Sequence, residues 1–557
     1  MLKQRGPIDR AVAGGPFGTL PPRPGFHWAD GISLLLIALF AAVVCRFAFV
    51  QDIWIDETTQ LSGSGLPFLK MVHWLLGTPK ALFVVPDDRM PLGSYALDWL
   101  GVHLFALSPL GLRLLHGALL VLGLVVMAAA LRRRFGPGCT AIALAILCLN
   151  PQIAMTAPEI RAYPLYLALA CAMIAPFLAI VDPAWNRGWR APIAVALLCA
   201  ATVHVHFFGA VMSACVFVVL IARHIGDRRA LIVLAVSGAL GAALSVAVLP
   251  FIVAASGQVD HAAGGGSIAT YAIYVSRLFV GSIHMVYPVA ASLLLAGLVL
   301  AGAAALWRLA AGGMEPARRG AFLSLVAVVL LGLAITIGAD IALDTLNAIK
   351  PTYSYWMMPF AAAAIAVGLS GMGLPARRPL ALLSRGAVAA IVAGGLIATG
   401  LLWRHAPLFA HGPGQMFAEA IGKDSAATLI FEPGDPLGYA ALPTRWRFHD
   451  DVAIWQAEPP AGDRLIRFAT GSPLFGATAP AAAVIDAGAP AILVGRVAAG
   501  SYRDVRAAID GHPRHLEAGP IAGRLAADPR WELVEERESQ GLFIARIWRF
   551  RARPATK

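Results

Sequence analysis

The first apolar stretch of the chain, GISLLLIALFAAVVCRFAFV (residues 31–50), is followed directly by QDIWIDE (residues 51–57). About 20 predominantly apolar residues form a helix long enough to cross the hydrocarbon core of a bilayer. The whole chain has 557 residues, of which 58% are hydrophobic and 14% are charged, whereas soluble domains average about 25% charged residues. The composition therefore indicates a polytopic α-helical membrane protein and excludes disordered, collagen-like and disulfide-stapled chains.

Further apolar stretches follow the first one, and together they predict about eleven transmembrane helices. They define a transmembrane domain over residues 1–403, with a first outer loop over residues 51–109. Residues 92–107 are also apolar, but we expect an interfacial or re-entrant helix there, because a span would move the next arginine cluster to the outer side. The predicted spans are residues 31–50, 110–131, 139–156, 162–181, 191–208, 209–222, 230–255, 286–307, 320–343, 355–373 and 386–403.

The net charge of +12 is unevenly distributed along the chain. If the N-terminus and the arginine clusters after every second span are cytoplasmic, that side holds 18 basic and 5 acidic residues of the transmembrane domain. The other side then holds 8 basic and 10 acidic residues. The positive-inside rule therefore predicts a multi-pass protein of the bacterial cytoplasmic membrane with a cytoplasmic N-terminal tail and a periplasmic C-terminus. Because the charge orients the chain among membrane lipids, we do not expect a nucleic-acid partner.

Residues 404–557 differ in composition and hold 18 basic and 17 acidic residues. Residues 428–433, 491–496, 531–539 and 542–550 have the pattern of strands, and YRDVRAAIDG (residues 502–511) has the pattern of a helix. This region is predicted to form a soluble, extracytoplasmic α/β domain. All six cysteines lie in or beside apolar runs without paired spacing, which argues against a zinc site and against structural disulfides.

Ionisable and aromatic residues gather on the predicted outer side. Carboxylates mixed with cations near the bilayer interface suit an anionic lipid headgroup together with a hydroxyl group that must lose its proton. We therefore expect the functional site there. The segments are WIDE (54–57), PDDRMPLGSY (86–95), APEIRAYPLY (157–166), HVHFFG (204–209) and KPTYSYW (350–356).

The order of these segments resembles the GT-C superfamily of polyprenyl-phosphate-sugar glycosyltransferases, in its protein O-mannosyltransferase and aminoarabinose-transferase branch. Residues 56–57 match the Asp-Glu pair of the family's first outer loop, and residues 88–95 match in part its acidic-basic-Pro-Pro-Leu-Tyr-Tyr motif. Residues 160–163 and 204–209 are similar to its later motifs. Residues 355–359 read Tyr-Trp-Met-Met-Pro where an Arg-Tyr pair is typical of the family.

The resemblance implies a hexosyl or pentosyl transferase that moves a sugar from an undecaprenyl-type phosphate to an acceptor hydroxyl with inversion. The acceptor would be a glycolipid, lipid A, a polysaccharide or a protein. The resemblance assigns the general base to Asp56. Glu57 would orient that base or bind sugar hydroxyls. The donor phosphate would be bound by Arg89, Arg161 and Lys350. The remaining donor-binding candidates are Asp87, Asp88, Glu159, Tyr163, His204, His206, Tyr353 and Tyr355.

Other interpretations of the same residues stay open. The acidic pair at 56–57 could simply begin a surface helix. Residues 87–89 and 159–161 could form ordinary ion pairs. The histidines and tyrosines could anchor the protein at the membrane–water interface. A divalent cation, Mg²⁺ or Mn²⁺, held by Asp56 and Glu159 is an alternative to a site without a cofactor. A flippase or transporter of lipid-linked sugars and a non-catalytic binding protein are the alternative functions. Transporters usually place ionisable residues near mid-membrane, unlike the predicted arrangement.

Overall fold

The structure is a computed structural model. It describes residues 27–77, 89–256, 266–343, 349–370, 378–410, 416, 419–420, 428–431, 454–456 and 490–554. The candidate residues Asp87 and Asp88 lie outside the described residues.

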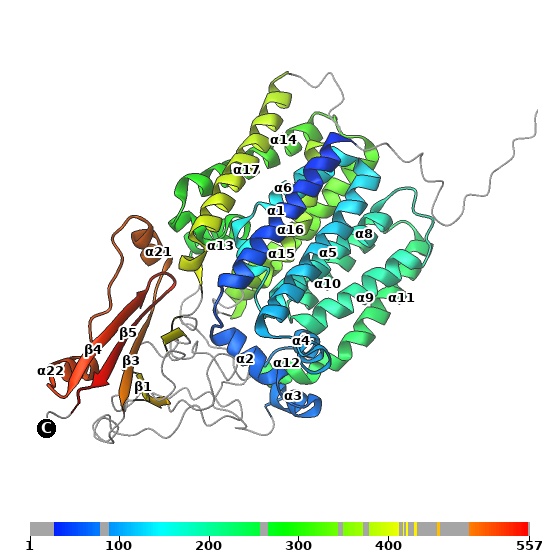
Figure 1. The fold of residues 1–557 in the computed structure, drawn as a ribbon. Coiled ribbons are helices and arrows are strands. Elements are labelled where there is room, and N and C mark those ends of the chain that lie inside the picture. Colours follow the sequence, from blue (N-terminus) through cyan, green and yellow to red (C-terminus); the bar gives the residue numbers. More distant parts are fainter. Residues whose placement is uncertain are drawn as a thin grey trace, which may run out of the picture.

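A bundle of long apolar helices forms the larger part of the molecule (Figure 1). Within the described residues, each predicted span lies mainly on one or more helices, which confirms the predicted polytopic helical fold. Seven helical segments in the described part of the chain are long and apolar enough to cross a membrane, counting Arg228–Ser256 as one. The helices of the predicted spans are α1 (Trp28–Val50), α5 (Pro109–Phe135), α6 (Pro137–Cys148), α7 (Pro151–Thr156), α8 (Ala162–Val181), α9 (Arg190–Val205), α10 (Gly209–Arg223), α11 (Arg228–Ser245), α12 (Leu249–Ser256), α14 (Pro288–Ala310), α15 (Pro316–Leu343), α16 (Met357–Leu369) and α17 (Arg378–His405).

The predicted single span over residues 139–156 is wrong in one respect, because the structure divides it into α6 and α7. The Asn150 side chain accepts hydrogen bonds from the backbone N–H groups of Gln152 and Ile153, at 2.9 and 3.1 Å, and so begins a new helix. Pro151 occupies the first turn of that helix, where its missing N–H costs nothing. The short helix α7 then leads into the link that carries Glu159 and Arg161.

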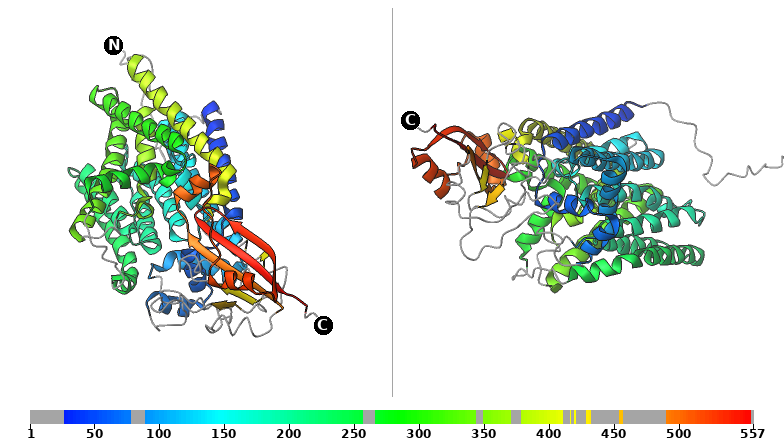
Figure 2. Two further views of the ribbon diagram at one scale, coloured as in Figure 1. Left: turned by 90° about the vertical axis from the view of Figure 1, so that its left-hand side faces the viewer. Right: turned by 60° about the horizontal axis from the view of Figure 1, so that its bottom comes forward.

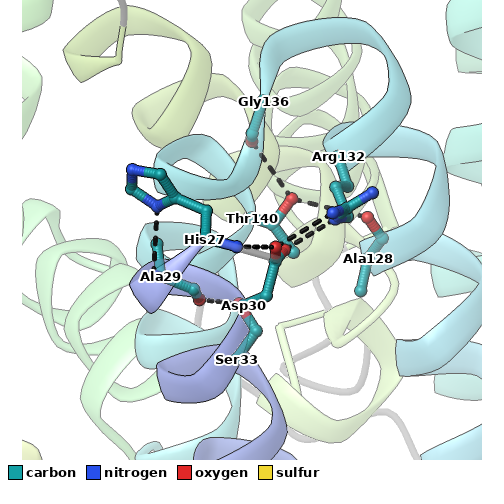
Figure 3. A network of polar contacts seen from close by, with 8 residues as sticks. All are labelled: His27, Ala29, Asp30, Ser33, Ala128, Arg132, Gly136 and Thr140. Carbon is teal, nitrogen blue, oxygen red and sulfur yellow. Dashed lines mark hydrogen bonds and ion pairs between the residues drawn. The ribbon is translucent and has the colours of Figure 1, made fainter. Parts of the chain in front are cut away.

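The two ends of the bundle differ in composition. At one end, Arg132 near the end of α5 donates to both carboxylate oxygens of Asp30 near the start of α1, at 2.6 and 2.9 Å (Figure 3). Arg318 of α15 reaches the Phe135 carbonyl at 3.0 Å, and Arg134 forms an ion pair with Asp182 after α8. The predicted cytoplasmic arginine clusters are therefore linked to one another at a single end.

The opposite end carries three short helices between α1 and α5, namely α2 (Ile55–Ser64), α3 (Phe68–Leu75) and α4 (Leu92–Phe105) (Figures 1 and 2). Since α1 begins and α5 ends at the arginine-rich end, α4 does not add a crossing between them. This arrangement agrees with the interfacial helix expected over residues 92–107. A further helix, α13 (Ile268–Val280), was not predicted from the sequence.

A mixed five-stranded sheet forms the core of the C-terminal domain, as predicted for an α/β domain. Its strands lie in the order β2-β1-β3-β5-β4, with β1 parallel to β2 and β3 and with β5 antiparallel to β3 and β4. The described elements are β1 (Thr428–Phe431), β2 (Ile454–Gln456), β3 (Ala491–Ala499), α21 (Tyr502–Ile509), α22 (Pro520–Ala527), β4 (Trp531–Ser539) and β5 (Phe543–Ala552). Among the strands of the described residues, β2 alone was not predicted.

The C-terminal domain packs against the bundle at the end that carries α2, α3 and α4 (Figures 1 and 2). Val505 and Leu542 are buried in a hydrophobic core that continues into the bundle. The backbone N–H of Leu542 donates to the Leu408 carbonyl at 3.0 Å, just beyond α17. A Cβ atom on Gly541, which has a φ of +136°, would lie 2.3 Å from the same carbonyl oxygen. Glycine is therefore needed at this close contact.

Candidate functional site

Asp56 and Glu57 lie in the first turn of α2, where acidic side chains interact favourably with the positive end of the helix dipole. Their side chains have different environments. The Asp56 side chain is 37% exposed, whereas the Glu57 side chain is 2% exposed. Only Asp56 is accessible to a substrate.

Glu57 is held by a buried ion pair with Arg113 of α5. The guanidinium contacts both carboxylate oxygens, at 3.3 Å from Nε and 2.5 Å from Nη2. The backbone N–H of Ile160 also donates to Glu57, at 2.9 Å, and Arg113 donates to the Gln51 and Asp52 carbonyls. Glu57 therefore joins α2 to α5 and to the link between α7 and α8, and this contact positions the neighbouring Asp56.

Asp56 is paired with Arg161, which caps the N-terminus of α8. One guanidinium nitrogen lies 3.6 Å from the Asp56 carboxylate, and another donates to the Asp56 backbone carbonyl at 3.2 Å. The same guanidinium lies 6.0 Å from the centre of the Tyr163 ring. A carboxylate, a cation and an aromatic ring are thus brought together from two distant segments of the chain.

Glu159 lies in the same link and is buried at 8% exposure. Burial raises the pKa of this carboxyl well above its usual range, and the negative charges of Glu57 and Asp56 raise it further. Arg161 and Arg113 oppose this effect but do not cancel it. Glu159 therefore tends to hold its proton and can donate a hydrogen bond.

Aromatic rings form a second wall of the site around His206. The imidazole lies 5.0 Å from the Tyr353 ring, 5.7 Å from Tyr163 and 5.3 Å from Tyr166, measured between ring centres. The Lys350 ammonium group lies 5.6 Å from the centre of the Tyr353 ring. The predicted candidates from three separate segments therefore come together here.

The hydrogen bonding of His206 leaves one ring nitrogen for a ligand. Its Nδ1 accepts from the Phe208 backbone N–H at 3.2 Å, so the proton of the neutral imidazole lies on Nε2. Nε2 is buried and has no hydrogen-bond partner among the residues that the structure describes. A buried donor of this kind is costly unless a substrate group or water satisfies it.

Two predicted residues lie away from this cluster. The His204 Nε2 atom contacts the Leu244 carbonyl of α11 at 3.0 Å. Arg89 donates to the Ala254 carbonyl of α12 at 2.6 Å. The remaining candidate with a side chain in the cluster region is Tyr355, which is buried and interacts electrostatically with Glu159.

No protein-family model and no curated protein matches the sequence. Similar solved structures include ArnT from Cupriavidus metallidurans bound to undecaprenyl phosphate, with a TM-score of 0.51 and 13% identity over 93% of this chain and 98% of ArnT. The apo state of ArnT gives a TM-score of 0.51 and 14% identity over 94% and 98% of the two chains. The arabinofuranosyltransferase AftD from Mycobacteria has a TM-score of 0.45 and 17% identity, over 94% of this chain and 40% of AftD.

The chain has the GT-C fold. The likeness to ArnT includes the bundle and the C-terminal domain, because it covers almost the full length of both chains. The resemblance found in the sequence motifs is therefore confirmed at the level of the fold. Within this GT-C fold, the site lies where the first outer loop, the α7–α8 link and the segment before α16 meet.

Sequence reasoning missed three residues of the site region, Arg113, Arg277 and Tyr502. Arg113 and Arg277 could have been noticed as single cations on the predicted outer side of an otherwise apolar sequence. The Arg277 Nε atom of α13 is buried and has no hydrogen-bond partner within the described ranges. Tyr502 begins α21 of the C-terminal domain, and no local signal distinguishes it from a surface tyrosine.

Among the described residues, no three or more His, Cys, Asp and Glu side chains form a group that could hold a metal ion. Asp56 and Glu159 are near enough to interact electrostatically, but Asp56 pairs with Arg161. Carboxylate oxygens with water would suit Mg²⁺ or Mn²⁺. A divalent cation on these two carboxylates stays a prediction.

Proposed function

We propose that the protein is a membrane glycosyltransferase that transfers a sugar from a polyprenyl-phosphate donor to an acceptor hydroxyl, with inversion at the anomeric carbon. The observation that carries the proposal is the accessible Asp56 carboxylate beside Arg161, at a cluster of cations, a buried carboxyl and aromatic rings. The GT-C fold and the undecaprenyl phosphate bound to ArnT support a lipid-linked donor. The reaction would take place on the periplasmic side of the cytoplasmic membrane.

In the proposed reaction, the acceptor oxygen attacks the anomeric carbon while the bond from that carbon to the phosphate oxygen breaks. The electron pair of the broken bond leaves with the lipid phosphate, and the hydroxyl proton passes to Asp56. The phosphodiester is a good leaving group, so its departure needs cations and no protonated acid. Arg161 orients the Asp56 carboxylate through the 3.6 Å contact.

The donor is proposed to bind through the cations and aromatic rings around Glu159. Arg277 and Lys350 are the phosphate-binding candidates, because an arginine guanidinium matches phosphate geometry and lysine adds a mobile charge, whereas Arg161 is engaged by the base Asp56. His206 Nε2 and the protonated Glu159 can donate to sugar hydroxyls. The Tyr163 and Tyr353 rings, 6.4 Å apart, offer faces against which a sugar can pack.

Replacing the base tests this proposal. In purified full-length protein, Asp56→Asn is expected to lower kcat for transfer from undecaprenyl-phosphate sugar by about 10²- to 10⁴-fold, because general-base catalysis contributes that much. The KM for the donor should change little, since the carboxylate acts on the acceptor. The rate is measured as release of free undecaprenyl phosphate.

Asp528→Asn is a matched control, because Asp528 pairs with Arg530 on the C-terminal domain at 2.7 Å and lies outside the site. Undiminished transfer by Asp56→Asn would exclude Asp56 as the base. Vesicles that translocate the lipid-linked sugar without any transfer would instead identify a flippase.

A further inference from the structure

The C-terminal domain reaches the site through the first turn of α21. The Tyr502 ring lies 6.4 Å from the Phe409 ring, which follows α17. One turn further along α21, Arg506 donates to the Val286 carbonyl at 2.9 Å. Val505 between them is fully buried in the core shared with the bundle. These contacts fix the position of Tyr502 relative to the bundle.

The surface on which α21 packs lies just beyond the end of α13. It is formed by η2 (Ser282–Met285), which follows α13 after Gly281, a residue with a φ of +74°. The Gly281 N–H donates to the Arg277 carbonyl at 2.8 Å, so Arg277 lies in the last turn of α13. Asn150, before α7, donates to the Phe279 carbonyl at 2.7 Å. The end of α13 is therefore attached to the segment that leads to Glu159.

Tyr502 is brought by this packing among Arg277, Ser282 and Glu159, which are its polar neighbours. Burial raises the pKa of Tyr502 to about 12, so its hydroxyl keeps its proton and can donate at physiological pH. Arg277 carries a permanent positive charge and a buried Nε–H without a partner in the described part of the chain. The Tyr502 oxygen can accept a hydrogen bond from the Ser282 hydroxyl and still direct its own O–H, together with the Arg277 Nε–H, at an anionic oxygen.

We infer that Tyr502 is a substrate-binding residue whose hydroxyl, together with the Arg277 guanidinium, binds a non-bridging oxygen of the donor phosphate. The inference rests on the proposed function. The C-terminal domain thereby completes the donor site of the bundle.

The positive charge of Arg277 and its Nε–H, unpartnered among the described residues, favour the donor phosphate over a neutral acceptor hydroxyl as the ligand. Asp56 belongs to α2 and Arg161 to the start of α8, whereas Tyr502 and Arg277 belong to α21 and α13. An inverting displacement needs the base and the leaving group on opposite faces of the sugar. We therefore assign the leaving phosphate to Tyr502 and Arg277, which come from other elements than the proposed base.

The test measures lipid binding to purified full-length protein carrying Tyr502→Phe, which keeps the ring against Phe409 and removes only the hydroxyl. Loss of a hydrogen bond to a charged group is expected to weaken binding of undecaprenyl phosphate by about 10- to 100-fold. Binding of undecaprenol, which has the same tail without the phosphate, should not change. Arg503→Ala is the control, because Arg503 is an exposed residue on the same helix.

Equal binding of undecaprenyl phosphate by Tyr502→Phe and wild type would overturn the inference and leave the proposed function standing. An equal loss of binding for undecaprenyl phosphate and undecaprenol would also overturn the inference, because that result indicates that the C-terminal domain no longer packs against the bundle. Wild-type protein that neither binds undecaprenyl phosphate nor transfers sugar from it would overturn the proposed function and this inference together.

Discussion

Asp56 and Glu57 are adjacent in the sequence but differ in what they can do. Successive helical residues point about 100° apart, which turns Glu57 into the bundle and leaves Asp56 at the surface of the site. Glu57 is buried and accepts three hydrogen bonds, from Arg113 and the Ile160 N–H, so a substrate hydroxyl cannot reach it. Of the two carboxylates predicted to be catalytic, Asp56 is therefore the accessible one and Glu57 is a positioning residue.

The raised pKa of Glu159 predicts how the stability of the protein depends on pH. The folded state binds this proton more tightly than the unfolded state, whose carboxyl has the ordinary value of 4.5. The stability contributed by the protonated form is complete below that pH and is lost as the pH rises through the folded-state pKa. Glu159→Gln should remove this loss, so its melting temperature in detergent should fall less than that of wild type between pH 5 and pH 9.

Glu315→Gln is the control for this measurement, because Glu315 is 70% exposed at the arginine-rich end of the bundle. Its melting curve should follow that of wild type at every pH. Parallel behaviour of Glu159→Gln and wild type would show that the buried carboxyl is not protonated.

At the scale of elements, two buried polar layers hold α2 in place. The Glu57–Arg113 pair forms the first layer, nearest the site. One helical turn further, the Gln60 amide donates to Asp98 of α4 at 2.5 Å, and His116 of α5 contacts the other Asp98 oxygen at 2.7 Å. Polar layers of this kind fix the rotation of a helix, because a turned helix would leave buried groups unpaired. The orientation of Asp56 depends on them.

The first layer is expected to give a strongly non-additive double-mutant cycle. Glu57→Met or Arg113→Met alone leaves an uncompensated buried charge and should cost about 3–5 kcal/mol, whereas the double variant should cost clearly less than the sum. Unfolding in mixed detergent micelles measures these free energies. Arg134→Met at the half-exposed Arg134–Asp182 pair should cost less than about 1 kcal/mol. Additive costs at Glu57 and Arg113 would contradict a coupled pair.

At the scale of the whole molecule, the charges are separated between the two ends of the bundle. Ion pairs such as Arg132–Asp30 and Arg187–Asp227 connect the arginine clusters at one end, and the site lies at the other (Figures 1 and 3). The excess of positive charge at the arginine-rich end thus predicts how the protein is oriented in the membrane. The end that carries the candidate site combines a few cations with carboxylates.

This separation predicts the topology of the protein in the membrane. Alkaline phosphatase fused after the last residue should be active, because the positive-inside rule places the C-terminal domain outside. The same enzyme fused after Gly312, in the turn between α14 and α15, should be inactive. Activities with the opposite pattern would reverse the orientation assigned to both ends.

The sequence by itself determined the features that depend on local composition. The length of apolar stretches specifies helices that cross a bilayer, and the strands β3, β4 and β5 follow from residue patterns of their own segments. The segments that carry Asp56, Arg161, His206 and Tyr353 could be identified because functional groups in a membrane protein stand out against apolar surroundings.

Only the tertiary structure decided which of these residues face the site. His204 and His206 are two residues apart, but His204 lies in the last turn of α9 and His206 has an extended backbone with a φ of −153°, so their rings face different elements. The pairing of Glu57 with Arg113 and the approach of Tyr502 to Arg277 join positions that are far apart along the chain. Such contacts depend on how helices and domains pack, and no local pattern encodes them.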